Sequence, residues 1–348
     1  MSFISTIAKE AGVSTTTVSL VANNKGKISK ATRQRVQSLL DRYQFQPRSS
    51  RVVKAKAPTP SAAFKLGTIC VVCPQISSDD DAPDGVYRYW SQALQKQIIK
   101  KGGNFSFVTG NLHAQNNLIF QQGLQDGLFA GIILMGVEDE DGYVNAALRS
   151  RVPLVILNRR SLHGEFSTVG QDNFGGGRLI AKHLIELGHQ RIGMIAPTSH
   201  SKISQYTQAR QVGFEFELKT HDLLPAFTFE LAPLEPDKTI HALAPKVRDS
   251  KATAVFLSTD LQAIQFIKQW EAMGLTVPGD LSIAGFDHAD VQTASGLKLT
   301  TIAHDSHAVA QRAVSMLEDL SNGQSEAMSE VVQVSLVTGD TTQRIDLT

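Results

Sequence analysis

The first two dozen residues carry two short helical patterns joined by a tight turn. The spacing predicts one helix over residues 4–11 and a second over residues 15–23. Gly12 can adopt a conformation that ends the first helix, Val13 supplies an apolar contact beneath the turn, and Ser14 is a good N-cap for the second helix. We interpret this stretch as a helix-turn-helix, an arrangement that places its second helix in the major groove of DNA.

Hydroxyl side chains crowd the first two turns of the second predicted helix. They are Ser14, Thr15, Thr16, Thr17 and Ser19. Hydroxyl groups at a helix N-terminus can hydrogen-bond phosphates and base edges, and the helix N-terminus itself attracts anions. This polarity therefore favours a surface that contacts DNA.

A third helix is predicted from the N-cap Ser29 to about Tyr43. Its apolar positions face a small core shared with the first two helices, made of Ile7, Val18, Ile28, Val36, Leu39 and Leu40. The alternative interpretation is a three-helix domain whose hydroxyl groups are only solvated.

The charge of the chain is unevenly distributed. Residues 1–60 contain eleven Lys and Arg against Glu10 and Asp41, a net charge of +9. Because the whole chain carries +1, residues 61–348 carry −8. A basic head on an acidic body favours a phosphate-backbone partner for the head alone.

At 348 residues the chain exceeds one ordinary domain, so a small head plus a larger body of two lobes is the natural division. No apolar run approaches the roughly 20 residues of a membrane span, and the N-terminus lacks the apolar segment of a secretory signal. We therefore expect a cytoplasmic protein.

Cys70 and Cys73 have the C-x-x-C spacing of redox and zinc motifs, but no second pair accompanies them, so we expect buried, reduced thiols.

From residue 66 onward, continuous apolar runs alternate with helical segments. Strands are predicted over residues 66–73, 105–109, 131–135, 154–157, 192–196, 254–257 and 281–286, and helices over 86–101, 116–125, 175–187, 204–219, 259–273 and 308–321. Apolar runs without polar alternation suit parallel strands that are covered on both faces. The fold class is therefore an all-α head plus an α/β body of two doubly wound parallel-sheet lobes, with a ligand cleft at the carboxyl ends of the strands.

A series of motifs runs in order along the chain. The head contains Ile7-Ala8-Lys9-Glu10-Ala11-Gly12-Val13-Ser14 and Thr17-Val18-Ser19, and the body contains Val155-Ile156-Leu157-Asn158-Arg159, Asp172-Asn173, Leu187-Gly188-His189, Arg210, Thr259-Asp260 and Ala284-Gly285-Phe286-Asp287. With these motifs the chain resembles the LacI/GalR family of bacterial transcription regulators over nearly its full length. The resemblance implies a homodimer whose heads bind the half-sites of a near-palindromic double-stranded DNA operator. It also implies a body like a periplasmic sugar-binding protein, in which a small-molecule effector, most simply a sugar, controls operator affinity; no cofactor is expected.

The resemblance also sets the expected domain boundaries. Residues 1–46 would form the DNA-binding head, residues 47–63 a basic hinge or linker, and residues 64–348 the effector-binding and dimerisation domain. Lobe 1 would span residues 64–171 and 305–334, and lobe 2 residues 172–304 and 335–348. The carboxyl end has no leucine heptads for a coiled-coil tetramer, so a dimer is expected.

Family positions assign DNA contacts to the head and the hinge. Bases in the major groove would be faced by Thr15, Thr16 and Leu20. Other DNA contacts, mostly to phosphates, would come from Ser14, Thr17, Ser19, Asn23, Lys27, Ser29, Thr32 and Arg51.

Two of these positions depart from the family pattern. Members commonly carry Arg where this chain has Leu20, and Arg is the strongest bidentate reader of guanine, so the preferred base should change. Many members wedge a hinge leucine into the minor groove, where this chain offers Val53 as a smaller wedge. Because β-branched Val52 and Val53 are weaker helix formers, the kink at the operator centre is an open question.

Family positions in the body predict the effector contacts. Arg210 would offer a planar fork to sugar hydroxyls or a carboxylate, and Asp287 would accept from a pair of hydroxyls. Four further candidates follow predicted strands, where a cleft should open; they are Asn158, Arg159, Thr259 and Asp260. Asp260 could instead only cap the following helix, and Arg159 could only form an ion pair between the lobes.

The loop over residues 75–87 departs from the family pattern. Aromatic residues there normally stack against sugar rings, and Tyr87, Tyr89 or Trp90 would substitute in this chain. The acidic run 79–81 is better explained as a solvated loop than as a metal site, and no metal is expected.

Three other functional classes fit the sequence less well. An enzyme needs paired catalytic groups, and we find neither a G-x-G-x-x-G motif nor a metal-like histidine spacing, so no catalytic residue is assigned. A solute-binding protein of a transport system would need a signal peptide and no basic head. A regulator whose degenerate cleft answers to a protein partner stays possible because of the divergent loop over residues 75–87.

Overall fold

A computed structural model describes most of the head and of the body. The described residues are 3–22, 26, 28–42, 67–73, 85–109, 113–137, 142–159, 161, 164–197, 205–231, 236–288, 293–324 and 326–345. Four predicted DNA contacts lie outside them: Asn23, Lys27, Arg51 and Val53. Most of the divergent loop also lies outside the described residues.

Three short helices form the head: α1 (Phe3–Ala11), α2 (Thr15–Ala22) and α3 (Lys30–Arg42). Gly12 ends α1 with a φ of 63°, and the amide of Val13 donates to the carbonyl of Ala8 at 3.0 Å. The hydroxyl oxygen of Ser14 accepts from the amide of Thr17 at 3.1 Å, which confirms the predicted N-cap of α2.

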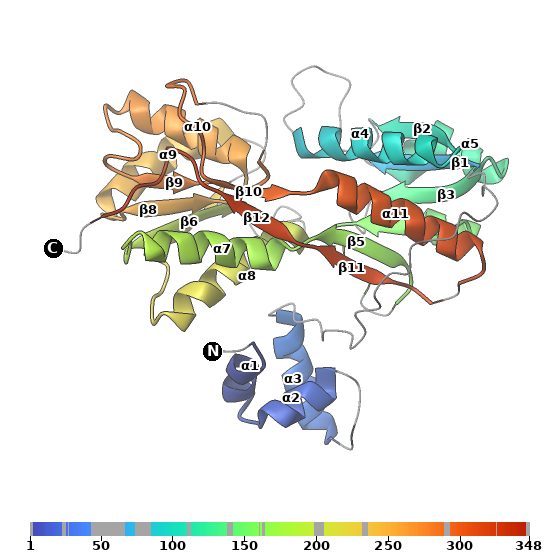
Figure 1. The fold of residues 1–348 in the computed structure, drawn as a ribbon, viewed down its shortest axis with the longest axis horizontal. Helices are drawn as coiled ribbons and strands as arrows, with labels where there is room; N and C mark the ends of the chain where they lie inside the picture. The colour runs from blue at the N-terminus through green and yellow to red at the C-terminus, as the bar shows by residue number, and fades with distance from the viewer. Residues whose placement is uncertain are drawn as a thin grey trace.

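The predicted head core is confirmed. Ile7, Val18 and Val36 are fully buried, and Ile28 and Leu39 pack against them half-buried. The same apolar cluster includes phenylalanines from helices α7 and α8 of the body, so the head packs against the lower side of the body in Figure 1.

Lobe 1 is built on a six-stranded parallel sheet in the order β11-β5-β4-β3-β1-β2. The strands are β1 (Thr68–Cys73), β2 (Asn104–Thr109), β3 (Phe129–Leu134), β4 (Leu154–Leu157), β5 (Ser167–Gln171) and β11 (Ser329–Val332). Helices α4 (Gly85–Lys100) and α11 (Ser306–Ser321) cover one face, and α5 (Leu118–Gln125) and α6 (Tyr143–Ser150) cover the other. A 3-10 turn, η1 (Ala114–Asn116), precedes α5.

Lobe 2 is built on a four-stranded parallel sheet in the order β7-β6-β8-β9. The strands are β6 (Ile192–Pro197), β7 (Thr228–Leu231), β8 (Ala254–Leu257) and β9 (Ser282–Ala284). Helices α9 (Pro236–Asp249) and α10 (Asp260–Ala272) pack on one face, and α7 (Asn173–Glu186) and α8 (Gln205–Thr220) on the other.

An antiparallel ribbon joins the two lobes. Strand β10 (Thr301–His304) pairs with β12 (Val334–Val337), with Thr301 opposite Val337 and His304 opposite Val334. Figure 1 shows this ribbon running between the sheets, where β10 leads into α11 and β12 follows β11. The chain therefore crosses from one lobe to the other through β10 and β12.

The predicted α/β alternation is confirmed, and seven elements were missed. The missed strands are β5, β7, β10, β11 and β12, and the missed helices are α6 and α9. Strand β5 reads Ser-Thr-Val-Gly-Gln, so its complete burial is not visible as an apolar run, and α9 contains Pro245. Cys70 and Cys73 are buried and reduced as predicted, and burial raises the pKa of Cys70 to about 12.

Within the described ranges, no helix combines the length and the hydropathy that crossing a bilayer requires. The same ranges hold no group of three or more His, Cys, Asp and Glu side chains arranged to bind a metal ion.

Candidate functional site

The head presents the N-terminal turn of α2 to solvent. Thr15 and Thr16 are exposed, while Thr17 and Ser19 are half-buried. The hydroxyl groups of Ser14 and Thr17 lie 2.9 Å apart, so both take part in capping α2. Two neighbouring threonine side chains are thus left pointing outward at a helix N-terminus, where a DNA groove can reach them.

Ser29 and Thr32 repeat this capping arrangement at the start of α3. The hydroxyl of Ser29 accepts from the amide of Thr32 at 3.2 Å and donates to its hydroxyl oxygen at 2.8 Å. Leu20, on α2, is half-buried, and its side chain lies against Gly26: a Cβ placed on Gly26 would be 3.3 Å from the Leu20 Cδ1. Leu20 is therefore partly covered by Gly26 and partly accessible to solvent.

A cavity of about 560 Å³ lies between the lobes. Lobe 2 contributes Asp260 and Asp287, α4 of lobe 1 contributes Tyr89, and the ribbon contributes Thr301 and His304. This volume lies in the range of small-molecule sites, which is roughly 300–1,000 Å³. A molecule in the cavity would contact both lobes and the ribbon that joins them.

Arg210, on α8, is the centre of a buried polar network. The side chain is 1% exposed, and its three nitrogens donate to Asn173 Oδ1 at 2.9 Å, to the Ser258 carbonyl at 2.6 Å and to Asp287 Oδ1 at 2.7 Å. The guanidinium carbon lies 3.8 Å from the ring centre of Phe286. This arrangement fixes the position of Arg210, because each of its three nitrogens donates to a protein acceptor and one of these acceptors is a carboxylate.

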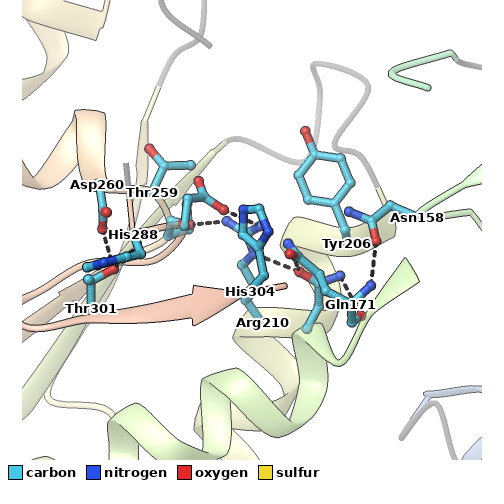
Figure 2. A network of polar contacts seen from close by, with 12 residues as sticks. Asn158, Gln171, Tyr206, Arg210, Thr259, Asp260, His288, Thr301 and His304 are labelled. Carbon is cyan, nitrogen blue, oxygen red and sulfur yellow. Dashed lines mark hydrogen bonds and ion pairs between the residues drawn. The ribbon is translucent and has the colours of Figure 1, made fainter. Parts of the chain in front are cut away.

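Asp287 and Asp260 line the cavity on the side of lobe 2. Asp287 follows β9 with a φ of 112°, and the next residue, His288, also has a positive φ of 49°. Consecutive non-glycine residues in this region store backbone strain, which is typical of functional sites. Asp260 Oδ1 accepts from the hydroxyl of Thr301 at 2.6 Å and so ties α10 to the ribbon. Figure 2 shows these contacts around Arg210.

Tyr89 is the aromatic residue of α4 that lines the cavity, and two buried aromatic residues of the same helix contact lobe 2 and the ribbon. Tyr87, on α4, is buried, and its hydroxyl lies 3.2 Å from the hydroxyl of Tyr206 on α8, so this contact joins the two lobes directly. Trp90, one turn further along α4, donates from its indole nitrogen to Nδ1 of His304 at 3.4 Å. The two rings meet edge to face with their centres 5.8 Å apart.

His304 is a neutral imidazole at physiological pH. Burial, the positive charge of Arg210 and the neighbouring His288 together lower its pKa to about 4, against a small opposing effect of Asp305. A neutral histidine donates from one ring nitrogen and accepts at the other.

The other predicted cleft residues have structural contacts. Asn158 has a φ of 53°, and its Oδ1 accepts from the amide of Gln171 at 3.0 Å, which joins β4 to β5 (Figure 2). Thr259 caps α10 by accepting from the amide of Gln262 at 3.3 Å. Arg159 donates to the carbonyl of Val137 at 3.4 Å within lobe 1.

The structure thus brings Arg210, Asp260 and Asp287 together, with Tyr87 facing them from lobe 1. Sequence reasoning missed four residues of the same region: Asn173, Tyr206, Ser258 and His304. Asn173 and Ser258 stand beside the motifs at Asp172 and Thr259, so position after a strand was a usable signal. Tyr206 and His304 carried no local signal, because their partners are more than 100 residues away.

The fold and this cleft define a class: a helix-turn-helix head attached to a two-lobed receptor of the periplasmic-binding-protein type. Comparison with protein-family models supports both the head and the receptor in this description. Residues 4–48 match the model described as bacterial regulatory proteins of the lacI family, and residues 181–342 match the periplasmic binding protein-like domain. The chain thus carries a DNA-binding head of the lacI family followed by a periplasmic-binding-protein-like domain, and it is a DNA-binding regulator with a ligand-binding domain rather than an enzyme.

Curated relatives match along most of the chain. The transcriptional repressor CytR of Escherichia coli strain K12 is 28% identical over 333 residues, which are 91% of this chain and 89% of CytR. The repressor PurR of Klebsiella pneumoniae is 27% identical over 347 residues, 97% of this chain and 96% of PurR.

Solved structures share the fold. The regulator CelR in complex with cellobiose has a TM-score of 0.67 at 21% identity and covers 98% of this chain and all of its own. A LacI-family regulator from Enterococcus faecium with bound ribose has a TM-score of 0.65 at 22% identity, covering 80% of this chain and all of its own. The lac repressor dimer bound to operator has a TM-score of 0.65 at 21% identity, covering 97% and 98%.

Proposed function

We propose that this protein is a homodimeric repressor whose heads bind a near-palindromic operator and whose interlobe cavity binds a sugar that changes operator affinity. The observation that carries the proposal is the Arg210–Asp287 pair, buried beside a cavity lined from both lobes. CelR and the Enterococcus faecium regulator bind cellobiose and ribose in this fold, which supports a sugar as the effector.

In the head, we assign base contacts to Thr15, Thr16 and Leu20. The exposed threonines stand at the positive end of α2, where hydroxyl groups can reach base edges. We assign phosphate contacts to the remaining predicted hydroxyl residues, Ser14, Thr17, Ser19, Ser29 and Thr32. Asn23, Lys27, Arg51 and Val53 remain assigned from sequence.

In the cleft, we assign ligand contacts to Arg210 and Asp287, with Tyr87 covering the ligand from lobe 1. Arginine has five N–H donors, and three are engaged by protein acceptors, so two remain for ligand oxygens. Asp260 borders the cavity and holds the ribbon, while Asn158 and Thr259 chiefly order the strand ends. We assign Arg159 to the lobe-1 side of the cleft, where it donates to the carbonyl of Val137.

A ligand controls DNA binding only if it binds one lobe arrangement better than another. Here it would touch Tyr89 of lobe 1, Asp287 of lobe 2 and Thr301 of the ribbon. Its binding energy would therefore differ between a closed and an opened pair of lobes. Rotation of lobe 1, which follows the hinge, would change the spacing of the two heads.

Selection of bound duplexes from a random library, with and without ribose or cellobiose, tests the proposal. We expect a near-palindrome whose recovery depends on one of the sugars. Recovery of the same palindrome irrespective of any sugar would contradict the effector assignment, and recovery of no motif would contradict the operator assignment.

A further inference from the structure

Two phenylalanines of lobe 2 pack with the head rather than with their own lobe. Phe174, on α7, is 8% exposed and Phe216, on α8, is 3% exposed, and their ring centres lie 5.7 Å apart. Among the described residues, neither ring belongs to the two apolar clusters that form the core of lobe 2. Both belong to the cluster that contains Ile7 and Val18 of the head, which lies beneath α7 and α8 in Figure 1. Without the head, two aromatic side chains would stand at the surface of lobe 2.

Charged side chains accompany this apolar contact. The guanidinium carbon of Arg178 lies 5.4 Å from the ring centre of Phe216, and its Nη2 pairs with Oε2 of Glu217 at 2.7 Å. A second ion pair joins the body to the head, because Nζ of Lys219 lies 3.9 Å from Oε2 of Glu10 in α1. Apolar patches that are rimmed by polar residues typically mark interaction surfaces. We call this surface of lobe 2 the head-docking face, and it consists of Phe174, Val212, Phe216 and Lys219.

The covalent connection does not force the head onto this face. Residues 43–66 connect α3 to β1, which belongs to lobe 1, whereas the head-docking face belongs to lobe 2. A connection of about 24 residues can reach roughly 80 Å when fully extended. The net charge of +9 in residues 1–60 and of −8 in residues 61–348 attracts the head to the body. The head can therefore both make this contact and leave it.

The docked position opposes DNA binding. In a helix-turn-helix, the first helix crosses the DNA backbone while the second lies in the major groove. Docking places Glu10, near the end of α1, against the acidic body. A DNA backbone that crosses α1 would meet the negative charge of the body, so docking and DNA binding exclude each other.

We propose that the head-docking face is an autoinhibitory site that holds the head of the same chain away from DNA. This inference rests on the proposed function, because it needs a head that binds an operator. Only the undocked fraction of heads can bind DNA, so nine docked heads in ten would raise the apparent operator Kd about tenfold. Because the linkage is reciprocal, saturating DNA must in turn release the head.

Carbodiimide cross-linking of the full chain detects docking directly. The reagent joins a carboxylate to a neighbouring amine by an amide bond, so it can link Glu10 to Lys219 across their 3.9 Å separation. The pair Lys101–Glu318 of lobe 1, at 2.8 Å, is the internal control. Mass spectrometry identifies the linked peptides before and after saturation with the selected operator duplex, and a denaturing gel shows whether a link joins one chain or two.

We expect the Glu10–Lys219 link within single chains of the DNA-free protein and its loss when the duplex is saturating. The Lys101–Glu318 link should form under both conditions. A Glu10–Lys219 link that is absent from the DNA-free protein, that joins two chains, or that persists on saturating duplex would overturn this inference and leave the proposed function standing.

Two substitutions should release the head in the absence of DNA. Phe216→Ala shortens an aromatic side chain of the docking face, and Phe229→Ala makes the same change at a half-buried phenylalanine that packs against the core of lobe 2. Lys219→Glu places a carboxylate opposite Glu10. Its control, Lys182→Glu on α7, has the same effect on net charge at a similarly exposed position. Because the Lys219 side chain is 60% exposed, its substitution tests docking even where Phe216→Ala does not fold.

Phe216→Ala should form less of the Glu10–Lys219 link and should bind the operator about three- to tenfold more tightly than wild type in fluorescence anisotropy. Phe229→Ala should match wild type in both measurements. Lys219→Glu should bind about two- to fivefold more tightly than Lys182→Glu, because an exposed ion pair contributes little. Operator binding by Phe216→Ala and Lys219→Glu that is no tighter than that of their controls would overturn this inference alone. Failure of both wild type and Phe216→Ala to bind any duplex would overturn the proposed function as well.

Discussion

Arg210 is the residue on which the cleft depends most. Its charge is buried, and both its stacking on Phe286 and its ion pair with Asp287 are internal to lobe 2. A buried ion pair is costly to break because removing one partner leaves the other charge desolvated. Arg210 therefore positions Asp287 as well as offering donors to a ligand.

Replacing Arg210 with alanine should remove the sugar response and destabilise lobe 2. The unpaired Asp287 carboxylate is expected to lower the free energy of unfolding by about 3–5 kcal/mol. Urea unfolding followed by circular dichroism measures this loss, and Arg149→Ala, at an exposed position of α6, is the control. Operator affinity of the folded fraction should be unchanged, because the contacts of Arg210 lie within lobe 2 and none of them is with the head; a loss of sugar-independent operator binding would contradict the assignment.

His304 should make stability depend on pH. Its pKa is about 4 in the folded protein, while an unfolded histidine titrates near 6.5. Between these values the unfolded chain binds the extra proton, so stability present at pH 7 is lost as the pH falls. From pH 7 to pH 5 we expect His304 to account for a loss of about 2 kcal/mol.

Two other histidines act in the same direction, the half-buried His183 and the buried His189. Burial lowers the pKa of His183 and of His189, so both also disfavour folding at low pH. The His304→Gln variant should therefore lose less stability than wild type between pH 7 and pH 5 in urea unfolding, without becoming insensitive to pH. Identical losses in the two proteins would show that His304 does not titrate as described.

At the scale of single residues, the sequence predicted which side chains belong to the site but not which side chains they contact. Arg210 and Asp287 were predicted through family resemblance, but their ion pair joins positions 77 residues apart and has no local pattern. Capping residues such as Ser14 and Ser29 were predicted correctly because an N-cap depends only on its own first turn.

Among the elements, α7 and α8 form the closest helix pair of lobe 2. A Cβ on Gly177 would lie 2.0 Å from the carbonyl oxygen of Arg210, and one on Gly213 would lie 2.0 Å from that of Phe174. Neither backbone atom can move without separating the helices. The two glycines therefore set the position of α8, and with it the position of Arg210.

Gly213→Ala should push α8 away from α7 and weaken both the fold and ligand binding. The cost should be about 1–3 kcal/mol, as for overpacking in other cores. Thermal unfolding and titration of the bound sugar would report it, with Gln208→Ala at an exposed position of α8 as the control. Wild-type stability and affinity in Gly213→Ala would show that the helix contact does not hold the site.

Replacing Leu20 in α2 with arginine should change the base preferred at one symmetric pair of operator positions. Arginine pairs with guanine through two hydrogen bonds, worth about 1–3 kcal/mol of discrimination. Selection from a random duplex library measures the change, and Arg35→Ala on the exposed surface of α3 is a comparison that should keep the base preference. An unaltered motif for Leu20→Arg would refute the groove-facing assignment of Leu20.

Strands could be predicted from the sequence where the buried positions are also occupied by apolar residues. Strands such as β4 and β8 are continuous apolar runs because both of their faces are covered. Strand β5 is equally buried, but the hydroxyl groups of Ser167 and Thr168 bond to Met328 and Ser329, 161 residues away, and a local pattern does not reveal such contacts. The ribbon strands β10 and β12 were missed because each carries polar residues within its four positions and pairs with a strand that lies beyond α11 and β11 in the sequence.

At the scale of the whole molecule, the head and the body differ in net charge, and the cleft belongs to the body alone. The head carries a net charge of +9 over residues 1–60, and the body carries −8, so only the head attracts a polyanion. The cleft lies between the two sheets that the ribbon joins, so a ligand bound there would contact both lobes and the ribbon. The predicted domain boundaries within the body remain predictions, as do dimerisation and the hinge.

Fluorescence anisotropy of the selected operator duplex tests the central claim most directly. The full chain is titrated at several salt concentrations, with and without the sugar that binds the cleft. We predict salt-dependent binding, because phosphate contacts release counterions, and a change of at least about tenfold in Kd on adding the sugar. Binding that ignores salt, or an operator Kd that does not change when the cleft is saturated with sugar, would contradict the account.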